Sequence, residues 1–213
     1  MRQIKICDMT MLQEAKHRER FSLTFKEKTE IAELLDNIGV DVIALEGADD
    51  DKADILRLKA ISGIVKNAAL AVSVKPNKEN IDLISDAVKE AKHKRLVLSL
   101  PVSTVQMEYS YRLKQDGMLQ LIKENLEYMA GICPDTEFVA MDATRADRDF
   151  LCEVLRTAAG AGAGTITPYE ESGKCFRKNS GDLCRSLWRR FRSWQMSVWA
   201  SAVPMPSPWR RPV

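Results

Sequence analysis

The chain has 213 residues, of which 45% are hydrophobic and 29% charged, with a formal net charge of +2, and this composition argues against disorder throughout. Its five cysteines include no CxxC pair, which argues against a disulfide framework and a zinc module and indicates a reducing cytoplasm. No apolar run reaches about 18 residues and the first ten residues lack a signal-peptide core, so we predict a cytoplasmic protein without membrane contact.

Between residues 1 and 168, short apolar or β-branched segments alternate with longer amphipathic segments. We predict strands at 4–7, 40–47, 69–74, 95–100, 137–142 and 164–168. We predict helices at 26–39, 49–67, 77–92, 116–132 and 147–162. Strands that are apolar on both faces and are separated by helices form a parallel sheet with crossover helices. The predicted class is therefore α/β.

The alternation fits either an open doubly wound sheet or a (β/α) barrel, and composition does not decide between them. Polar residues stand at the ends of the predicted strands: Asp8, Glu46, Lys75, Asp142 and Thr167. Barrel enzymes place their chemistry at the carboxyl ends of the strands, so this array favours a partial TIM barrel. It would hold about six of eight βα units, followed by an irregular basic tail.

The segments 25–43, 91–109 and 137–167 resemble the synthases that make 2-isopropylmalate, homocitrate and citramalate, and the part at 142–151, DATRADRDFL, is fairly specific. By this resemblance the chain is identified as a divergent and truncated member of the DRE-TIM metallolyase superfamily, which also contains hydroxymethylglutaryl-CoA lyase. The resemblance implies a synthase-like partial barrel at 1–174. Residues 175–213 would be a non-homologous tail.

The resemblance also implies an activity, that of an acyltransferase that condenses an acyl-CoA, usually acetyl-CoA, with a 2-oxo acid. These two small molecules are the implied partners, and family members are homo-oligomers. The implied cofactor is a divalent metal ion, which polarises the oxo acid. A cation steadies the developing oxyanion and a base takes a proton from the thioester methyl group.

Two of the motifs that would supply this chemistry are altered. The first motif of the family aligns with DMTMLQEAK, in which Asp8 and Thr10 match. Leu12 stands where the family has its arginine, and Gln13 replaces the metal-binding aspartate. Met141 occupies the position of a glutamate on strand five. Leucine and methionine carry no charge, so these positions contribute neither a cation nor a base.

The rest of the expected metal site is also missing, although Asp142, Thr144 and Arg145 match the family. The family has an HxH pair on strand seven, but the only histidines are His17 and His93. A glutamine carbonyl alone is a poor beginning for a divalent metal site. We therefore expect no bound metal and an inactive chain.

A polar pocket at the ends of the strands remains an alternative to complete loss of function. The candidate residues for it are Asp8, Thr10, Gln13, Glu46, Asp142, Thr144, Arg145, Thr167 and Glu170. Salt bridges with Lys75 or Arg145 would explain the carboxylates equally well. Two hypotheses stay open: an enzyme lineage with rebuilt chemistry on 2-oxo acids or acyl-CoA, and a non-catalytic ligand-binding or interaction protein on a barrel scaffold.

The tail differs in composition from the rest of the chain, since residues 175–213 contain all four tryptophans and eight Lys/Arg against one acid. If one base were lost after Gly173, restoring it would, with permitted codon choices, give MLPEEF and a segment typical of strand seven of the family, so we interpret the tail as out-of-frame translation and as disordered. A basic aromatic arm for nucleic acid is the less favoured interpretation. A solvated tail without a partner is the third.

A barrel of six βα units leaves strand edges open and exposes apolar interior, and both are aggregation hazards. We therefore expect this chain to fold poorly and to be aggregation-prone.

Overall fold

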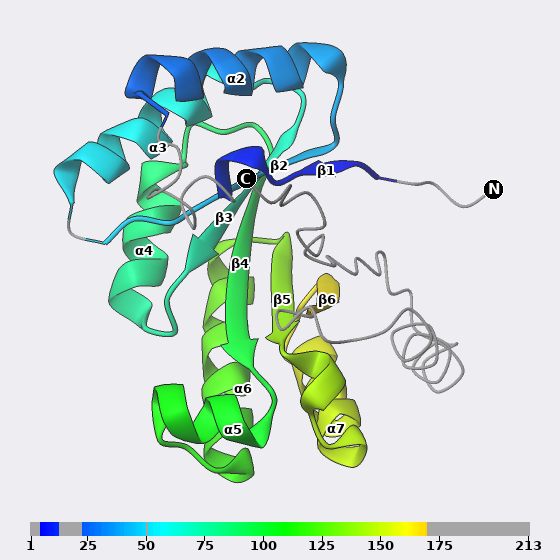
Figure 1. Ribbon diagram of the computed structural model, residues 1–213. Coiled ribbons are helices and arrows are strands. Elements are labelled where there is room, and N and C mark those ends of the chain that lie inside the picture. Colours follow the sequence, from blue (N-terminus) through cyan, green and yellow to red (C-terminus); the bar gives the residue numbers. More distant parts are fainter. Residues whose placement is uncertain (1–4, 13–22, 50, 170–213) are drawn as a thin grey trace, which may run out of the picture.

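The computed structural model describes residues 5–12, 23–49 and 51–169, which form a curved parallel sheet with its connecting helices (Figure 1). The sheet order is the chain order, and each strand pairs in parallel with the next. The strands are β1 (Cys7–Asp8), β2 (Val42–Leu45), β3 (Ala69–Val74), β4 (Lys94–Pro101), β5 (Thr136–Met141) and β6 (Thr165–Tyr169). A doubly wound sheet would reverse its order at a switch point, so the predicted partial TIM barrel is confirmed.

The helices follow the predicted alternation, with additional short turns after β4 and β5. The α-helices are α2 (Phe25–Ile38), α3 (Lys52–Ile64), α4 (Lys78–Ala87), α5 (Thr104–Gln106), α6 (Gln115–Ile132) and α7 (Arg148–Gly160). The turn α5, the π-helix η1 (Met107–Tyr111) and the 3-10 turn η2 (Ala143–Arg145) were not predicted. Of the helices in the described part of the chain, none has the length and apolar character needed to cross a membrane.

Local sequence signals explain where the helices begin and end. Thr24 caps α2 through the Glu27 amide, and the Glu27 side chain accepts from the Thr24 amide in return, which makes a capping box. Gly39 ends α2 with φ 88°, a left-handed conformation that glycine adopts without strain. The Asp147 side chain caps α7, and Gly162, with φ 99°, turns the chain from α7 toward β6.

The two faces of the sheet differ in burial. On β5, Phe138 and Ala140 are fully buried on the outer face, where α6 covers the strand. Glu137, Val139 and Met141 alternate with them and remain partly exposed on the inner face. Right-handed crossovers between parallel neighbours place the helices on one side of the sheet, so the main core lies between helices and sheet. The inner face is the interior of the partial barrel.

Candidate functional site

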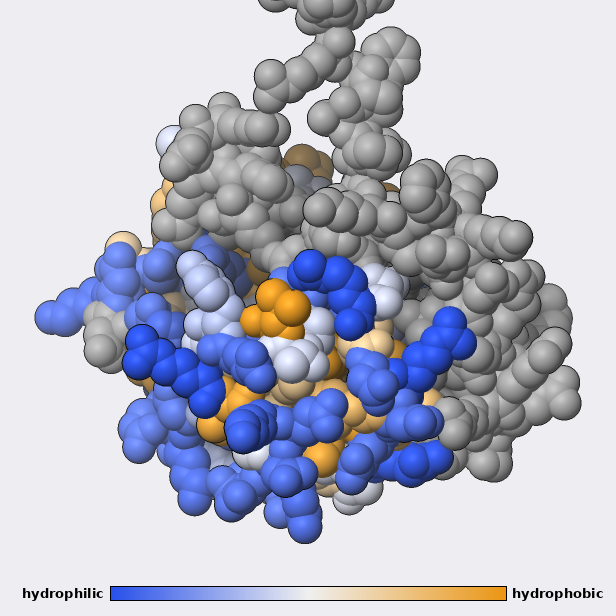
Figure 2. All heavy atoms as spheres, turned by 60° about the horizontal axis from the view of Figure 1, so that its bottom comes forward, coloured by the Kyte–Doolittle hydropathy of each residue, from blue (hydrophilic) through white to orange (hydrophobic). Residues whose placement is uncertain are grey.

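The carboxyl ends of the strands form the edge at which a barrel enzyme would carry its site. The carboxyl end of β4 lies near α5, at the bottom of Figure 1. Figure 2 brings this end forward and shows a mostly hydrophilic surface with several apolar areas between the hydrophilic residues. Of the predicted pocket residues, Gln13 and Glu170 lie outside the described residues, so the geometry of the site rests on the others.

Asp8 is held by its own turn. Its carboxylate accepts hydrogen bonds from the Thr10 amide and the Thr10 hydroxyl, both at 3.0 Å. The register pairs Asp8 with Ile43, whose side chain belongs to the outer core, and it pairs Cys7 with Val42. Paired residues of neighbouring strands share a face, so it is Cys7, not Asp8, that has an inner-face position on β1.

Asp142 is fully buried and compensated by two neighbours. Its carboxylate accepts a hydrogen bond from the Ser103 hydroxyl. Arg145 adds a two-pronged contact, with Nε at 2.7 and 2.9 Å from the two carboxylate oxygens and Nη2 at 2.7 Å from one of them. The salt bridge with Arg145 that the sequence left open as an explanation is therefore present. Thr144 lies beside it, partly buried, in η2.

Glu46 follows β2 at the same edge, and its carbonyl oxygen accepts a hydrogen bond from Arg57 Nη2 at 3.4 Å. Lys75 follows β3 and pairs with Asp49 at 2.6 Å in an exposed ion pair. The ionic partner of Lys75 is thus Asp49, which was not among the pocket candidates. The loops that carry Glu46 and Lys75 are joined by Asn80, because its amide donates to the carbonyl of Ala48 and accepts from the Lys75 amide, both at 2.8 Å.

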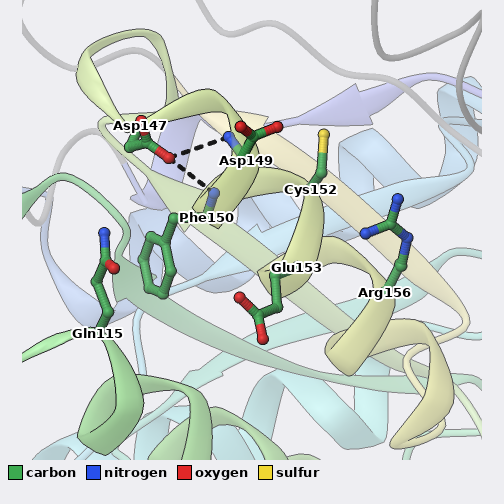
Figure 3. A pocket seen from close by; sticks show the side chains of 7 residues that line it. All are labelled: Gln115, Asp147, Asp149, Phe150, Cys152, Glu153 and Arg156. Atoms are coloured by element: carbon green, nitrogen blue, oxygen red, sulfur yellow. Dashed lines mark hydrogen bonds between the residues drawn. The ribbon is translucent and has the colours of Figure 1, made fainter.

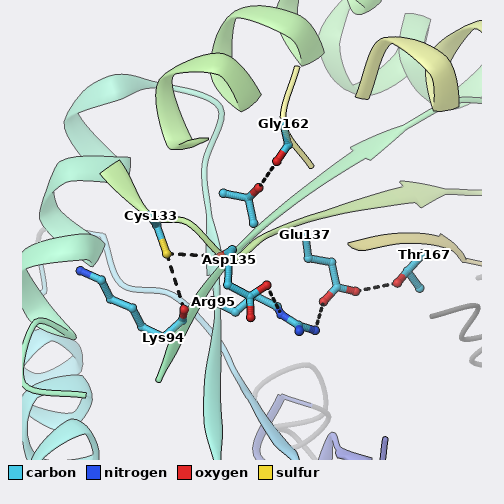
Figure 4. A network of polar contacts seen from close by, with 8 residues as sticks. Lys94, Arg95, Cys133, Asp135, Glu137, Gly162 and Thr167 are labelled. Atoms are coloured by element: carbon cyan, nitrogen blue, oxygen red, sulfur yellow. Dashed lines mark hydrogen bonds and ion pairs between the residues drawn. The ribbon is translucent and has the colours of Figure 1, made fainter. Parts of the chain in front are cut away.

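A polar network that the sequence reasoning missed lies on the inner face, toward the amino ends of the strands (Figure 4). Arg95 donates to Asp135 at 2.9 Å and to Glu137 at 3.2 Å, and its side chain is 8% exposed. Glu137 accepts a further hydrogen bond from the Thr167 hydroxyl at 2.6 Å. Thr167 was a candidate for the mouth of the barrel, but its hydroxyl is directed to this deeper network. Charged residues inside otherwise apolar strands were the available signal.

The network shifts the pKa values of its members. Burial favours the neutral form of Arg95, but the hydrogen bonds and charges of Asp135 and Glu137 outweigh it and raise the pKa above its ordinary value. Cys7 is exposed, but loss of hydration among the surrounding groups raises its pKa to about 11, and the Glu137 carboxylate acts in the same direction. An arginine held between two carboxylates is a structural ion pair, and Cys7 is a poor nucleophile at neutral pH.

A surface hollow lies between the first residue of α6 and the amino-terminal half of α7 (Figure 3). The residues that line it are Gln115, Asp147, Asp149, Phe150, Cys152, Glu153 and Arg156. Asp147 uses its carboxylate to cap α7, through the amides of Asp149 at 3.1 Å and Phe150 at 2.9 Å. Across residues 5–12, 23–49 and 51–169, no three His, Cys, Asp or Glu side chains converge as metal ligands would. The acidic residues that line this hollow therefore do not form a metal site either.

Comparison with known proteins identifies the family. A sequence model of the HMGL-like family matches residues 3–198. The chain belongs to the HMGL-like family. This confirms the predicted membership of the DRE-TIM metallolyase superfamily. The match extends beyond residue 174, and the predicted division of the chain at that point stays a prediction.

Individual relatives agree with this placement. The chain is 33% identical to the 2-isopropylmalate synthase of Pyrococcus furiosus over 188 residues, which are 88% of this chain and 38% of that protein. It is 28% identical to the 2-isopropylmalate synthase of Leptothrix cholodnii over 191 residues, 90% of this chain and 37% of that protein. The chain thus spans less than half the length of these relatives. Over the part that aligns with them, it is similar to the synthases.

Solved structures support the fold. Hydroxymethylglutaryl-CoA lyase from Pseudomonas aeruginosa superposes with a TM-score of 0.66 at 12% identity, over 87% of this chain and 63% of that one. The HMG-CoA lyase of Bacillus subtilis gives a TM-score of 0.64 at 12% identity, over 84% and 61%. At this identity the likeness shows the fold alone, a parallel barrel arrangement of strands and helices.

Proposed function

We propose that this chain is a synthase-like member of the HMGL-like family that does not itself condense an acyl-CoA with a 2-oxo acid. The observation that carries the proposal is the inner-face layer at the carboxyl ends of β4, β5 and β6. There Met141 pairs with Pro101 on one side and Tyr169 on the other. The resemblance to the synthases implies a glutamate at the Met141 position, so a layer expected to carry charge is formed here by uncharged side chains.

The chemistry explains why this layer matters. Removing a proton from a thioester methyl group requires a base, and the developing oxyanion requires a fixed positive charge or a metal ion. A thioether and a proline ring supply neither. The neighbouring carboxylate of Asp142 is buried and already paired with Arg145, which removes it as a free base.

The described residues also do not fit the divalent metal ion of the family. Hard divalent cations require several oxygen or nitrogen ligands that converge on one point. Asp8 directs both carboxylate oxygens to Thr10. Leu12, in the position of the family's arginine, is partly buried and carries no ligand atom. We therefore assign no step to a metal ion.

A thiol-release assay tests the proposal. Purified chain is incubated with acetyl-CoA, Mg²⁺ or Mn²⁺ and a panel of 2-oxo acids, with the 2-isopropylmalate synthase of Pyrococcus furiosus as the positive control. We expect no CoA release above that of heat-denatured chain. Sustained turnover that depends on the oxo acid would refute the proposal and favour an enzyme with rebuilt chemistry.

A second candidate function, ligand binding without turnover, has support from the retained residues of the β5–α7 turn. Arg145 is 47% exposed on its side chain while it is paired with Asp142, so part of a cationic group faces solvent near the strand ends. Calorimetric titration with 2-oxo acids and with CoA separates this function from complete loss of binding. In both cases we propose a cytoplasmic protein whose partners are small molecules, with neither membrane nor nucleic acid among them.

A further inference from the structure

The segment after β4 contacts the core of the protein through Met107 and the partly buried Tyr111. It consists of α5 and η1, and Met107, at 1% exposure, is its one fully buried residue. Val105 is 68% exposed and Tyr109 is 89% exposed, so both side chains face solvent. The segment ends at Arg112, which has φ 55°. A π-helix that closes on a left-handed residue is an unusual connection, and such turns are frequent at functional sites.

Two bonds connect the base of this segment to the end of β5. The Val102 amide donates to the Met141 carbonyl at 3.0 Å, which extends the pairing of β4 with β5. The Ser103 hydroxyl donates to the Asp142 carboxylate. Ser103 is 1% exposed and also caps α5, because its oxygen accepts from the Gln106 amide at 3.4 Å. The side-chain bond therefore joins the first turn of α5 to the β5–α7 turn.

The backbone at Asp142 is adapted to this bond. Asp142 has φ 59° and ψ 35°, a left-handed conformation that costs other L-residues energy but that aspartate tolerates better than most. It turns the chain directly from β5 into η2. Because Arg145 neutralises Asp142, the carboxylate keeps a charged partner when the bond to Ser103 opens. Opening therefore breaks one hydrogen bond without leaving an isolated buried charge.

We infer that α5 and η1 form a flap at the carboxyl end of β4 and that the Ser103–Asp142 hydrogen bond is its latch. With the latch closed, the flap and the β5–α7 turn are held together. With the latch open, α5 and η1 unfold locally between Val102 and Arg112, which opens the hydrogen bonds within them and uncovers the end of β4. The inference does not depend on whether the chain turns over a substrate.

Hydrogen exchange followed by mass spectrometry tests the latch on the full chain. The reporters are amides bonded within the flap: Met107 to the Ser103 carbonyl, Arg112 to the Glu108 carbonyl and Leu113 to the Met107 carbonyl. A hydrogen bond to a charged group shifts an opening equilibrium by about ten- to a hundredfold. We expect Asp142→Ala and Ser103→Ala each to accelerate exchange of these amides by about tenfold or more, with α4 unchanged.

A double-mutant cycle separates the latch from the capping role of Ser103. Asp142→Ala leaves the cap intact, so faster flap exchange in this variant supports the latch. The double variant should then add little to either single change, because both remove the same bond. Independent effects that multiply, or an unchanged flap in Asp142→Ala, would overturn the inference. Ser110→Ala, an exposed change within η1, is the matched control and should leave exchange as in the wild type.

If Asp142→Ala accelerates exchange over the whole chain, the charge-neutral Asp142→Asn variant replaces it in the cycle. It keeps the left-handed turn and weakens the bond from Ser103. Acceleration confined to the flap again supports the latch, and an unaltered flap in a folded Asp142→Asn protein counts against it.

Discussion

Asp36 offers a direct test of how the amino-terminal side of the partial barrel is held together. It lies in the last turn of α2, is 7% exposed, and accepts hydrogen bonds from three successive backbone amides: Lys66 at 2.9 Å, Asn67 at 2.9 Å and Ala68 at 2.7 Å. A carboxylate at a helix carboxyl terminus is unfavourable by itself. These bonds connect α2 to the loop that leads into β3. They also explain why the Asp36 carboxylate is tolerated at the end of the helix.

The expected effect of Asp36→Ala follows from the exposure of these donors. Ala68 is 2% exposed, so its amide would lose a charged acceptor without gaining water. The Lys66 and Asn67 residues are exposed, and their amides can be rehydrated. One buried bond to a carboxylate and two partly replaced bonds give a destabilisation of about 3 kcal/mol. This is a large part of the 5–15 kcal/mol that stabilises a typical domain.

The pH dependence gives an independent check. Burial raises the pKa of Asp36, but the bonds from the amides of Ala68, Lys66 and Asn67 outweigh it, and the pKa lies below its ordinary value of 3.8. Because the folded-state pKa is the lower one, the stabilisation is complete above the unfolded value and is lost as pH falls through the folded value. The difference between wild type and Asp36→Ala should therefore be constant near pH 7 and should narrow below about pH 4.

Urea denaturation followed by circular dichroism measures both effects. Glu33→Ala, an exposed change on the same helix, is the matched control and should remain within about 0.5 kcal/mol of the wild type. The reasoning fails if Asp36→Ala is as stable as Glu33→Ala at pH 7. It also fails if the loss in Asp36→Ala is undiminished at pH 3 while the wild type is still folded.

Two further predictions concern positions where the sequence alone gives little guidance. Gly47→Ala should destabilise the protein by about 3 kcal/mol in thermal denaturation, because the new Cβ would lie 2.1 Å from the Ser73 carbonyl oxygen. Gly63→Ala in α3 should stabilise the protein by about 0.5–1 kcal/mol, because its new Cβ would meet no atom within 4 Å. Cys7, with a pKa of about 11, should react with iodoacetamide at pH 8 roughly a hundredfold more slowly than in the urea-unfolded chain. Glu137→Gln should accelerate that reaction, and equal rates in mass spectrometry for both folded proteins would contradict the assigned role of the carboxylate.

The regular elements could be read from the sequence because each is long and has one clear period. The segment 69–74 was predicted with the bounds of β3, and the predicted helix at 147–162 contains α7. The turn α5 and the π-helix after it were missed because they are too short for a hydrophobic period to develop. Ser103 was the available signal, since serine before a helical turn is a common cap.

The candidate site was predicted less well than the fold, because strand register decides which side chains meet. Sequence placed Asp8 at the end of a strand, but only the pairing with Ile43 shows that it takes an outer position. Thr167 was correctly placed in a strand, but the partner of its hydroxyl, Glu137, is 30 residues away. Contacts at such a separation depend on how β5 and β6 pair and leave no local pattern.

The distribution of charge inside the partial barrel links stability to the proposed loss of activity. At the amino ends of the strands, Arg95, Glu137 and Thr167 form a satisfied network across β4, β5 and β6. Barrels use that end for stability and the opposite end for chemistry. At the opposite end the same three strands present Pro101, Met141 and Tyr169. On the inner face of β4, β5 and β6, as far as the structure describes them, the charges lie where they hold the strands together and the carboxyl-end layer has none, which agrees with the proposed loss of activity.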